Sequence, residues 1–483
     1  PVWLEITSDG VKTHPAVELW GCEIPDTIGQ LKAKDTAAVC IGPAGENKVL
    51  FASIANEGGR SSGRGGTGAV MGSKNLKAIV ARGKAKPGIA DSEIYKFVDY
   101  EARKMVKASP RTSQGLPEFG TSVLVNLMNR YGVLPTRNFQ QGTFEHAEAI
   151  SGERLREEFL IKRDACWSCP IGCKRKTKTS HGSGDGPEYE TIYALGSTLG
   201  IDDFETVIEA NYLCNHLGMD TISCGVTIAC AMELAEAGKL DTELGFGRSD
   251  LLLKMVEDIA YRRELGADLA EGSKRLASKY GAPEVAMQSK GLEFPAYDPR
   301  GMQGQGLLYA TSNRGACHLR GNMLGPELLG APKMLDRHAT SGKAGVLIVL
   351  QHTNAVIDSI GMCKFVNFAI GDDFFARMMT ATTGIEYEVQ DLQLAGERIW
   401  NLERLYNLKA GFTREDDALP PRFISEPLNE GSSAGHVVHL DEMLEEYYRF
   451  RGWTQDGIPT ERKLNTLGLA TLGSALLEEN SHA

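Results

Sequence analysis

The segment that decides the fold reads GRGGTGAVMGSKNLKAI from Gly63 to Ile79. Its glycines permit positive φ angles and a close approach of the backbone to a ligand, and Arg60, Arg64 and Lys74 add positive charge. Because backbone amides in such turns bind anions, we expect a phosphate group here, against the alternative of a flexible surface loop. The string is neither a P-loop nor a dinucleotide-binding fingerprint, since its context differs.

The segments on either side of this loop differ in periodicity. Residues 1–88 are expected to be β-rich, because short apolar runs alternate with Gly, Asn and Pro turns. The expected strands span residues 37–41, 48–54 and 76–80. From Asp91 onward the apolar period is helical, and the predicted helices span residues 92–107, 204–217, 221–237, 250–263 and 267–279.

Two later stretches are expected to lack regular structure. Residues 298–306 are rich in glycine and are predicted to form a loop, and residues 409–439 are rich in Pro, Gly and acidic residues. The chain contains no internal repeat and no long low-complexity tract.

Three cysteines lie within eight residues, in the run Cys166-Trp-Ser-Cys169-Pro-Ile-Gly-Cys173. The Pro and Gly between them favour a tight turn, so the thiolates are expected to converge on one metal centre. A [4Fe–4S] cluster needs a fourth thiolate, which often comes from elsewhere in the sequence. Structural zinc, with His181 as the fourth ligand, is the alternative. Simple packing of three such close thiols is disfavoured.

Composition narrows the class of protein. The 483 residues, 42% hydrophobic and 24% charged, are typical of a globular protein of several domains. A net charge of −11 argues against general binding to nucleic acid. We find no apolar run of 18 residues and no signal peptide, so we expect no membrane span. Ten dispersed cysteines do not form a disulfide scaffold, and we expect a cytoplasmic protein.

At this point the residues resemble a known family. The string from Gly63 to Ile79 closely resembles the cofactor-binding segment of the aldehyde ferredoxin oxidoreductase family, and CWSCPIGCKR resembles its iron–sulfur segment. Further segments resemble the family in the same order along the chain. They span residues 186–197, 216–225, 298–321, 358–365, 397–417 and 435–454.

The resemblance implies a tungsten ion, or more rarely molybdenum, held by two pyranopterins, with magnesium bridging their phosphates as a further expectation. The protein supplies no tungsten ligand and holds the pterins instead. The residues carried over as cofactor-binding are Arg60, Arg64, Gly65, Gly66, Gly68, Asp220, Arg320 and Asp358. The family's first pterin motif often has a second acid, and Asn215 stands in its place here.

The resemblance also assigns the redox and catalytic residues. The implied [4Fe–4S] ligands are Cys166, Cys169, Cys173 and Cys363, and the two ionisable groups near the metal are Glu190 and His318. Taken singly, His318 would be a structural histidine and Glu190 a surface acid. Only the surrounding motifs make these two residues catalytic.

The implied fold is α+β, with an N-terminal β-sheet cofactor domain followed by two mainly α-helical domains. The expected boundaries give a β-rich pterin-binding domain at residues 1–88, a helical domain with the cysteine run at 89–290, and a helical C-terminal domain at 291–483. Relative to the family, the chain lacks the first part of the β domain, so we expect part of the pterin cradle to be missing.

The implied activity is oxidation of aldehydes to carboxylic acids, with electrons leaving through the cluster to ferredoxin or a similar carrier. A homodimer or a multi-subunit complex is left open. Three alternatives remain: a benzoyl-CoA-type ring-reducing subunit, a non-catalytic iron–sulfur relay subunit, and a zinc-stabilised binding protein. We further predict that the basic run Lys174-Arg-Lys-Thr-Lys178 docks the acidic electron carrier, against the alternative of a solvated loop or internal charge balance.

Overall fold

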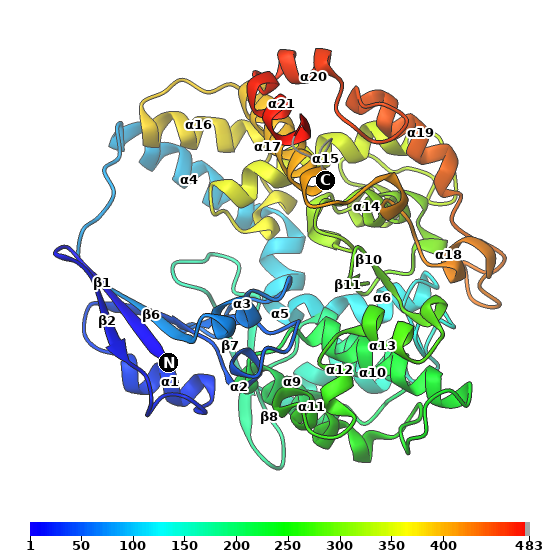
Figure 1. Cartoon of the computed structure of the whole chain (residues 1–483). Coiled ribbons are helices and arrows are strands. Elements are labelled where there is room, and N and C mark those ends of the chain that lie inside the picture. The colour runs from blue at the N-terminus through cyan, green and yellow to red at the C-terminus, as the bar shows by residue number, and fades with distance from the viewer. Residues whose placement is uncertain (479–483) are drawn as a thin grey trace. The chain divides into compact units, whose positions relative to one another are not determined.

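The computed structural model describes residues 1–478, which divide into two compact units. Unit 1 comprises residues 1–86 and 118–296, and unit 2 comprises residues 87–117 and those from 297 onward. A small N-terminal sheet precedes a mainly helical chain (Figure 1), so the expected α+β class is confirmed. The division into three domains stays a prediction.

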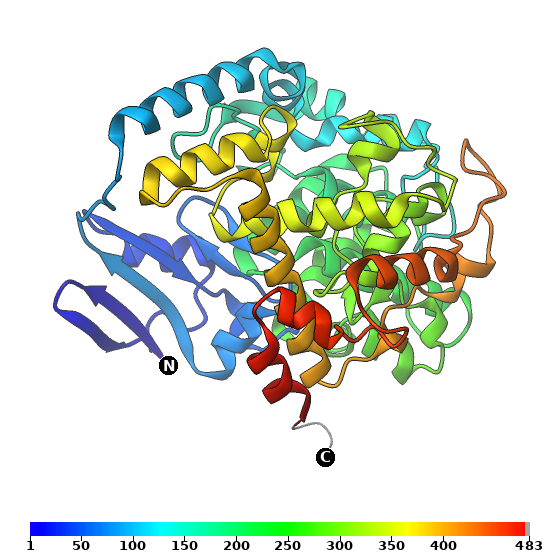
Figure 2. The ribbon, with the colours of Figure 1, turned by 90° about the horizontal axis from the view of Figure 1, so that it is seen from above.

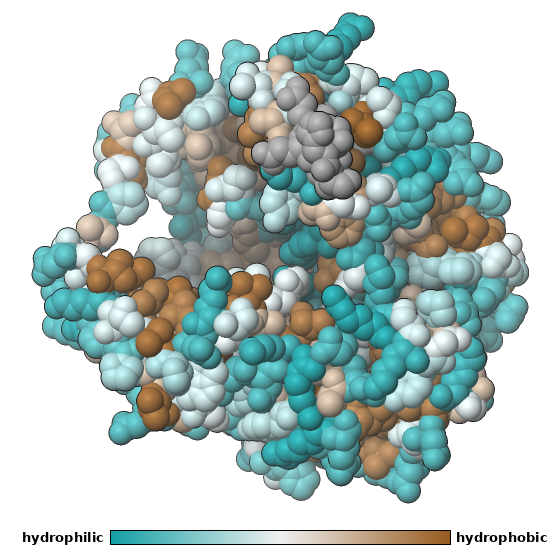
Figure 3. Space-filling model, in the orientation of Figure 1, coloured by the Kyte–Doolittle hydropathy of each residue, from teal (hydrophilic) through white to brown (hydrophobic). Residues whose placement is uncertain are grey.

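The main sheet of unit 1 has the strand order β2-β1-β6-β3-β4-β5. Its β1 pairs in parallel with β6, and its other neighbouring strands are antiparallel. Helix α1 (Ile24–Leu31) packs Ile24 and Ile28 onto the inner strands, against Ala78 and Val80. Figure 3 shows apolar side chains at the surface over the β1–β2 end of the sheet. The strands are β1 (Val2–Thr7), β2 (Gly10–Pro15), β3 (Thr36–Cys40), β4 (Ile54–Asn56), β5 (Ser61–Ser62) and β6 (Leu76–Arg82).

The expected strand over residues 48–54 is wrong, although those over 37–41 and 76–80 are confirmed by β3 and β6. Val49, Phe51 and Ala52 are buried, but the backbone here hydrogen-bonds to helix ends, not to a strand. The Leu50 amide donates to the Ala270 carbonyl, and the Ser53 amide donates to the Gly218 carbonyl. An apolar run therefore signalled burial without specifying strand pairing.

The rest of unit 1 is mainly helical, with two small sheets. Its short hairpin strands are β7 (Leu160–Asp164), β8 (Lys174–Lys178) and β9 (Ser183–Asp185), and the second pair is β10 (Gln288–Ser289) and β11 (Leu292–Glu293). Its helices are α2 (Pro43–Glu46), α3 (Thr67–Ser73), α6 (Leu124–Arg130), α7 (Gly152–Arg154), α8 (Tyr189–Leu195), α9 (Phe204–Leu217), α10 (Thr221–Glu236), α11 (Leu252–Tyr261), α12 (Gly266–Leu269) and α13 (Ser273–Lys279), while α5 (Leu116–Phe119) spans the boundary between the units.

The predicted helices are confirmed where caps and periodicity agree. Helix α9 ends at Gly218, whose φ of +83° suits a glycine. Helix α10 is buried almost throughout, as its nearly continuous apolar sequence predicts. The predicted single helix over residues 267–279 is wrong, because the chain breaks between α12 and α13 at Gly272, which has a φ of +81°.

Unit 2 is built from helices. In Figures 1 and 2 helices α15 and α17 lie side by side, and α19 also packs on α15. Within residues 1–478 no helix is long and apolar enough to cross a membrane. The helices are α4 (Ser92–Ala108), which Asp91 caps as predicted, α14 (Gln303–Thr311), α15 (Lys343–Ser359), α16 (Asp372–Thr383), α17 (Val389–Lys409), α18 (Pro421–Ser425), α19 (Leu440–Arg451), α20 (Glu461–Thr466) and α21 (Ala470–Glu478).

The predicted loop over residues 298–306 is wrong, since α14 begins at Gln303. Glu327 accepts from the amides of Gly304 and Gln305 at 2.8 and 3.1 Å, and Lys343 pairs with this carboxylate at 2.6 Å. A buried carboxylate at a helix N-terminus stabilises the helix through its free amides and its dipole. The stabilising residue lies over 20 positions away, so local composition does not reveal it.

Candidate active site

The three clustered cysteines occupy the loop between β7 and β8. Cys166 is exposed, Cys169 is half-buried and Cys173 is buried. The Cys169 amide donates to the Cys166 carbonyl at 3.0 Å, and Ser168 and Gly172 have positive φ angles, so the loop turns as predicted. Its donor chemistry fits an iron–sulfur group. Across residues 1–478, however, no three His, Cys, Asp or Glu side chains converge as metal ligands, so the ligand set stays a prediction.

Arg60 connects this loop to the segment of the predicted catalytic glutamate. Its Nε donates to Cys166 Sγ at 3.3 Å, and its Nη1 donates to Glu188 Oε1 at 3.1 Å. Thr121 Oγ1 donates to the other Glu188 oxygen at 2.6 Å. Burial opposes the charge of Arg60, but Glu188 and Cys166 outweigh it and raise the pKa of Arg60. The guanidinium is therefore a fixed positive charge beside an exposed thiol.

The glycines of the loop that opens α3 differ in what surrounds them. A Cβ at Gly66 would lie 2.3 Å from the Leu50 carbonyl oxygen, and one at Gly68 would lie 2.5 Å from the Ser53 carbonyl oxygen. These two glycines are therefore explained by packing within the protein. Gly65 is exposed, has a φ of +100°, and would place a Cβ in open space.

The amides of Gly65 and Gly66 have no acceptor within residues 1–478. Two adjacent amides, that of Gly65 beside open space, with Arg64 next in sequence, suit a bound anion. This part of the loop fits the phosphate group of a pterin cofactor.

Two of the predicted cofactor-binding residues pair with each other in unit 1. Arg64 Nε donates to Asp220 Oδ2 at 3.0 Å, and both side chains are under a tenth exposed. Asp220 also caps α10 by accepting from the amides of Ile222 and Ser223. Ser223 Oγ donates onward to Glu293 at 2.6 Å. The pair is held in place by these bonds, and its carboxylate and guanidinium offer the acceptors and donors that a polar cofactor ring can bind.

Glu190 lies in the first turn of α8 and is half-buried. Its Oε2 accepts from the Ala296 amide at 2.9 Å. Tyr189 and Tyr193 of the same helix donate through their hydroxyls to the carbonyls of Ala296 and Phe294. These three bonds tie α8 to residues 294–296 and fix where the carboxylate points.

His318 begins a short 3-10 turn in unit 2 and is half-buried. Its ring lies 5.7 Å from the ring of Tyr297, centroid to centroid, with a tilt of 47°. The preceding residue, Cys317, is buried, and its sulfur accepts from the Leu319 amide at 3.4 Å and from Arg314 at 3.0 Å. The Cys317 sulfur thus stabilises the turn that carries His318.

The remaining predicted residues of unit 2 also come together. Arg320 donates to Asp358 Oδ2 at 3.0 Å, and Lys364 pairs with Asp358 Oδ1 at 2.9 Å. Lys364 directly follows Cys363, which is exposed. The carboxylate of Asp358 therefore brings the predicted cluster cysteine and a predicted pterin contact into one group. Asn215, which replaces the family's second acid, hydrogen-bonds only weakly to Asn211 at 3.4 Å.

The predicted docking role of the run Lys174–Lys178 is wrong. This run is strand β8, and Lys174 and Arg175 are buried. Lys174 and Lys176 both pair with Asp185, at 3.1 and 2.7 Å. The alternation of a strand turns neighbouring charges to different faces, so a run of basic residues did not make a basic surface.

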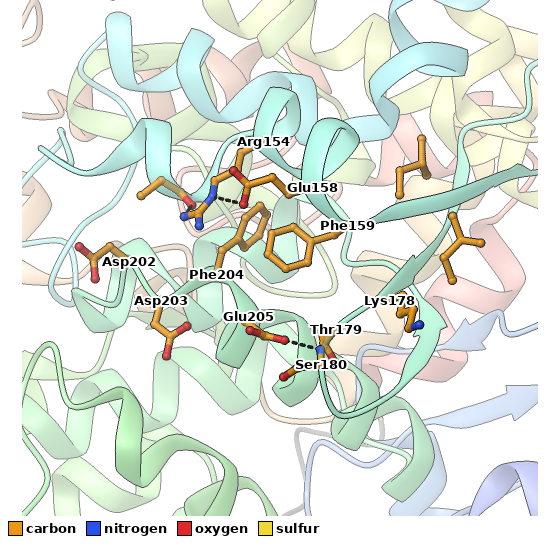
Figure 4. Close-up of a pocket in the computed structure, with 13 residues that line it drawn as sticks. Arg154, Glu158, Phe159, Lys178, Thr179, Ser180, Asp202, Asp203, Phe204 and Glu205 are labelled. Carbon is orange, nitrogen blue, oxygen red and sulfur yellow. Dashed lines mark hydrogen bonds and ion pairs between the residues drawn. The ribbon is translucent and has the colours of Figure 1, made fainter.

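One pocket of unit 1 lies at the far end of the same hairpin, with a volume of about 760 Å³ (Figure 4). It is lined by Phe159, Phe204 and Lys178 among others, and Arg154 pairs with Glu158 at its rim at 2.9 Å. None of the residues predicted to be catalytic, to bind the cofactor or to hold a metal lines it, so it is not part of the candidate site.

Sequence reasoning missed the residues that hold the predicted ones. Glu188 accepts from Arg60, Thr121 donates to Glu188, and Lys364 pairs with Asp358. Glu188 and Lys364 stand within two residues of predicted site residues, which was the available signal. Thr121 lies far away in sequence and gave none.

Comparison with known proteins identifies the family of the chain. The model of the aldehyde ferredoxin oxidoreductase N-terminal domain matches residues 1–83, and that of domains 2 and 3 matches residues 98–469. The chain belongs to the aldehyde ferredoxin oxidoreductase family. The family resemblance inferred from the sequence is confirmed.

Individual relatives of this family give the degree of likeness. The chain is 48% identical to the tungsten-containing aldehyde ferredoxin oxidoreductase of Thermococcus kodakarensis and 46% identical to that of Pyrococcus furiosus. Each alignment covers 97% of this chain and 80% of the relative. An aliphatic sulfonate oxidoreductase, WOR-like subunit, of Pyrococcus furiosus is 29% identical over 97% of the chain.

Among solved structures, the active site complex BamBC of benzoyl coenzyme A reductase with 1,5-dienoyl-CoA matches with a TM-score of 0.81. The match covers 99% of this chain and 81% of that one, at 21% identity. Such a likeness shows a shared fold, and function has to be argued from the site.

Proposed function

We propose that this member of the aldehyde ferredoxin oxidoreductase family oxidises aldehydes to carboxylic acids at a tungsten–pterin site. The observation that carries the proposal is the identity of 46–48% to tungsten-containing enzymes over 97% of the chain. The structure supports it by pairing the predicted cofactor-binding residues, Arg64 with Asp220 and Arg320 with Asp358. The free amides of Gly65 and Gly66, with open space at Gly65, suit the phosphate of the cofactor.

The reaction converts an aldehyde and water into a carboxylic acid, two protons and two electrons. When bound, the tungsten–pterin group would supply the two-electron acceptor. Glu190 would take a proton from the attacking water, and its bond to the Ala296 amide keeps the carboxylate oriented. His318 would donate a hydrogen bond to the aldehyde oxygen, on which negative charge develops.

The cofactor would be held by this chain's own charged groups. Arg64 and Arg320 would donate to the pterins, and their partners Asp220 and Asp358 fix the direction of each guanidinium. The electrons would leave through a [4Fe–4S] group on Cys166, Cys169, Cys173 and Cys363. Arg60 would stabilise the thiolate of Cys166 through its Nε.

The first experiment is metal analysis of anaerobically purified protein together with an aldehyde panel and a small dye as electron acceptor. We expect tungsten, iron and aldehyde-dependent dye reduction. Tungsten distinguishes the enzyme from a relay subunit that carries a cluster alone, and iron distinguishes it from a zinc-binding protein. Absence of aldehyde oxidation by tungsten-loaded protein would disprove the proposal.

The second experiment assigns the two catalytic roles. Glu190→Gln and His318→Ala should each lower kcat by about 10²–10⁴-fold, the usual contribution of a general acid or base, while tungsten content stays unchanged. Glu93→Gln is the control, since Glu93 is an exposed residue of α4 that pairs with Lys96. If Glu190→Gln and His318→Ala both retained the parent kcat on every accepted aldehyde, the roles would be wrong.

A further inference from the structure

One side chain of the cysteine loop is exposed to a degree that packing does not explain. Trp167, next to Cys166, is 98% exposed. Of the other four tryptophans, Trp400 and Trp453 are buried and Trp3 and Trp20 are half-buried. An indole in water forgoes the burial of a large apolar surface. Tryptophan is enriched among the central residues that contribute most of the binding energy of protein interfaces.

Two exposed cations, Lys162 and Arg163, precede the loop on β7. The alternation of the strand turns them to opposite faces, so they flank the loop from two sides. Neither forms an ion pair within residues 1–478, whereas Lys174 and Lys176 of the neighbouring strand pair with Asp185. On a chain of net charge −11, two unpaired cations within five residues of an exposed indole attract anionic partners locally.

We propose that the cluster-loop surface, made of Lys162, Arg163 and residues 165–168, is the docking surface for an acidic, ferredoxin-type electron carrier. The inference rests on the proposed function, because it assumes that electrons leave through the cysteine loop. It replaces the run Lys174–Lys178, in which Lys174 and Arg175 are buried and Lys176 pairs with Asp185.

The parts of this surface have separate tasks. Lys162 and Arg163 orient the acidic carrier during encounter, when long-range repulsion by the rest of the chain has to be overcome. Trp167 anchors the complex once it forms, since desolvated aromatic groups carry much of the binding energy of an interface. The exposed Cys166 lies in the same loop, so a docked carrier contacts the segment from which electrons would leave.

Helix α13 offers a matched control. Lys274 and Arg275 are adjacent and exposed on this helix of unit 1, and neither forms an ion pair within residues 1–478. Lys274→Glu/Arg275→Glu, the α13 control, therefore replaces two cations by two anions, the same charge change, outside the cluster-loop surface.

The experiment compares the double variant Lys162→Glu/Arg163→Glu, Trp167→Phe, Trp167→Ala and the α13 control as cofactor-loaded protein. Binding of a purified acidic ferredoxin is measured by titration calorimetry across a salt series. Aldehyde oxidation is followed with ferredoxin and with a small dye, and iron content and sedimentation are measured for each variant. Trp167 lies between two proposed ligands, so the charge variant tests docking without touching the ligand spacing.

We expect the double variant and Trp167→Ala each to raise the Kd for ferredoxin by about 10-fold or more, and Trp167→Phe to raise it less. In the double variant, the salt dependence should weaken, while iron content and the dye-coupled rate stay at the parent level. The α13 control should bind ferredoxin as the parent does. Parent-like affinity in the double variant and Trp167→Ala, or an equal loss in the α13 control, overturns the proposal.

Two further outcomes distinguish failure of the docking proposal from failure of the proposed function. A change of sedimentation without a change in ferredoxin affinity would assign the surface to a second copy of the chain and overturn the proposal. Failure of the parent protein to oxidise any aldehyde with the dye would instead disprove the proposed function, whatever the binding data show.

Discussion

At the scale of single residues, the candidate site is built from charges that are already paired. Arg64 with Asp220 and Arg320 with Asp358 each join two side chains that the sequence assigned separately to the cofactor. Pairing holds each group in one direction, which lowers the entropic cost of binding a cofactor. Removing one partner would also leave the other charge without its counter-charge.

We therefore expect the contributions of Arg64 and Asp220 to the free energy of unfolding to be strongly coupled. Breaking a buried ion pair by removing one partner costs about 3–5 kcal/mol, so Asp220→Ala should lower the thermal midpoint of cofactor-free protein. The double variant Arg64→Met/Asp220→Ala should lose less than the sum of the single variants. The exposed pair Arg248–Asp250 is the control, and its removal should have no measurable effect. Additive losses at Arg64 and Asp220 would contradict the coupling.

A second prediction at this scale concerns pH. Burial, with the nearby Arg451 guanidinium, lowers the pKa of His352 to about 3, and its Nε2 lies 2.7 Å from Arg451 Nη1. In the unfolded chain this imidazole titrates near its ordinary value of about 6.5. Between these two values the unfolded state binds the extra proton, so stability falls as the pH drops from about 6.5 toward 3.

Over this pH range the free energy of unfolding falls by about 1.4 kcal/mol per pH unit, because only the unfolded state takes up the proton. His352→Gln keeps a hydrogen-bond acceptor for Arg451 but cannot be protonated, so its thermal midpoint should fall less between pH 7 and pH 5. Burial also lowers the pKa of His338, to about 4, and His338→Gln serves as a parallel comparison. A pH dependence in His352→Gln as steep as that of the parent would rule out His352 as a source.

At the scale of elements, the loop that opens α3 separates two kinds of glycine. Gly66→Ala and Gly68→Ala would place a Cβ within 2.5 Å of backbone oxygens, so cofactor-free protein should already lose stability. Gly65→Ala meets open space and carries only the strain of its positive φ, of order 1–3 kcal/mol. Its main effect should be on tungsten retention. Thermal midpoints without cofactor and tungsten contents after loading distinguish the two classes.

The sequence predicted those elements whose stabilising residues lie close by in the chain. Helices with local signals, such as α4 with its cap Asp91 and α9 with its stop Gly218, follow from neighbouring residues. Helix α14 depends on Glu327, and the segment around Phe51 depends on helix ends far along the chain. Pairings between motifs, such as Arg60 with Cys166, arise only when the chain folds. Residue identities were therefore predictable from motifs, whereas their partners were not.

At the scale of the whole molecule, the predicted cluster ligands come from distant parts of the sequence. Cys166, Cys169 and Cys173 belong to unit 1, and Cys363 belongs to unit 2. Three cysteines in one loop could alternatively hold a smaller iron–sulfur group without Cys363. The four-cysteine assignment therefore depends on Cys363, whose neighbour Lys364 already joins the Arg320–Asp358 group.

Cys363→Ala is expected to lose iron, because a [4Fe–4S] cluster without its fourth thiolate is held less tightly. Iron per chain should fall below four and the electron paramagnetic resonance signal of the reduced cluster should change or disappear. Cys22→Ala is the matched control, since Cys22 is half-buried in unit 1 and outside the proposed set. A full four-iron complement with an unchanged signal in Cys363→Ala would remove this residue from the ligand set. Iron loss in Cys363→Ala but not in Cys22→Ala would support the assignment made from the motif alone.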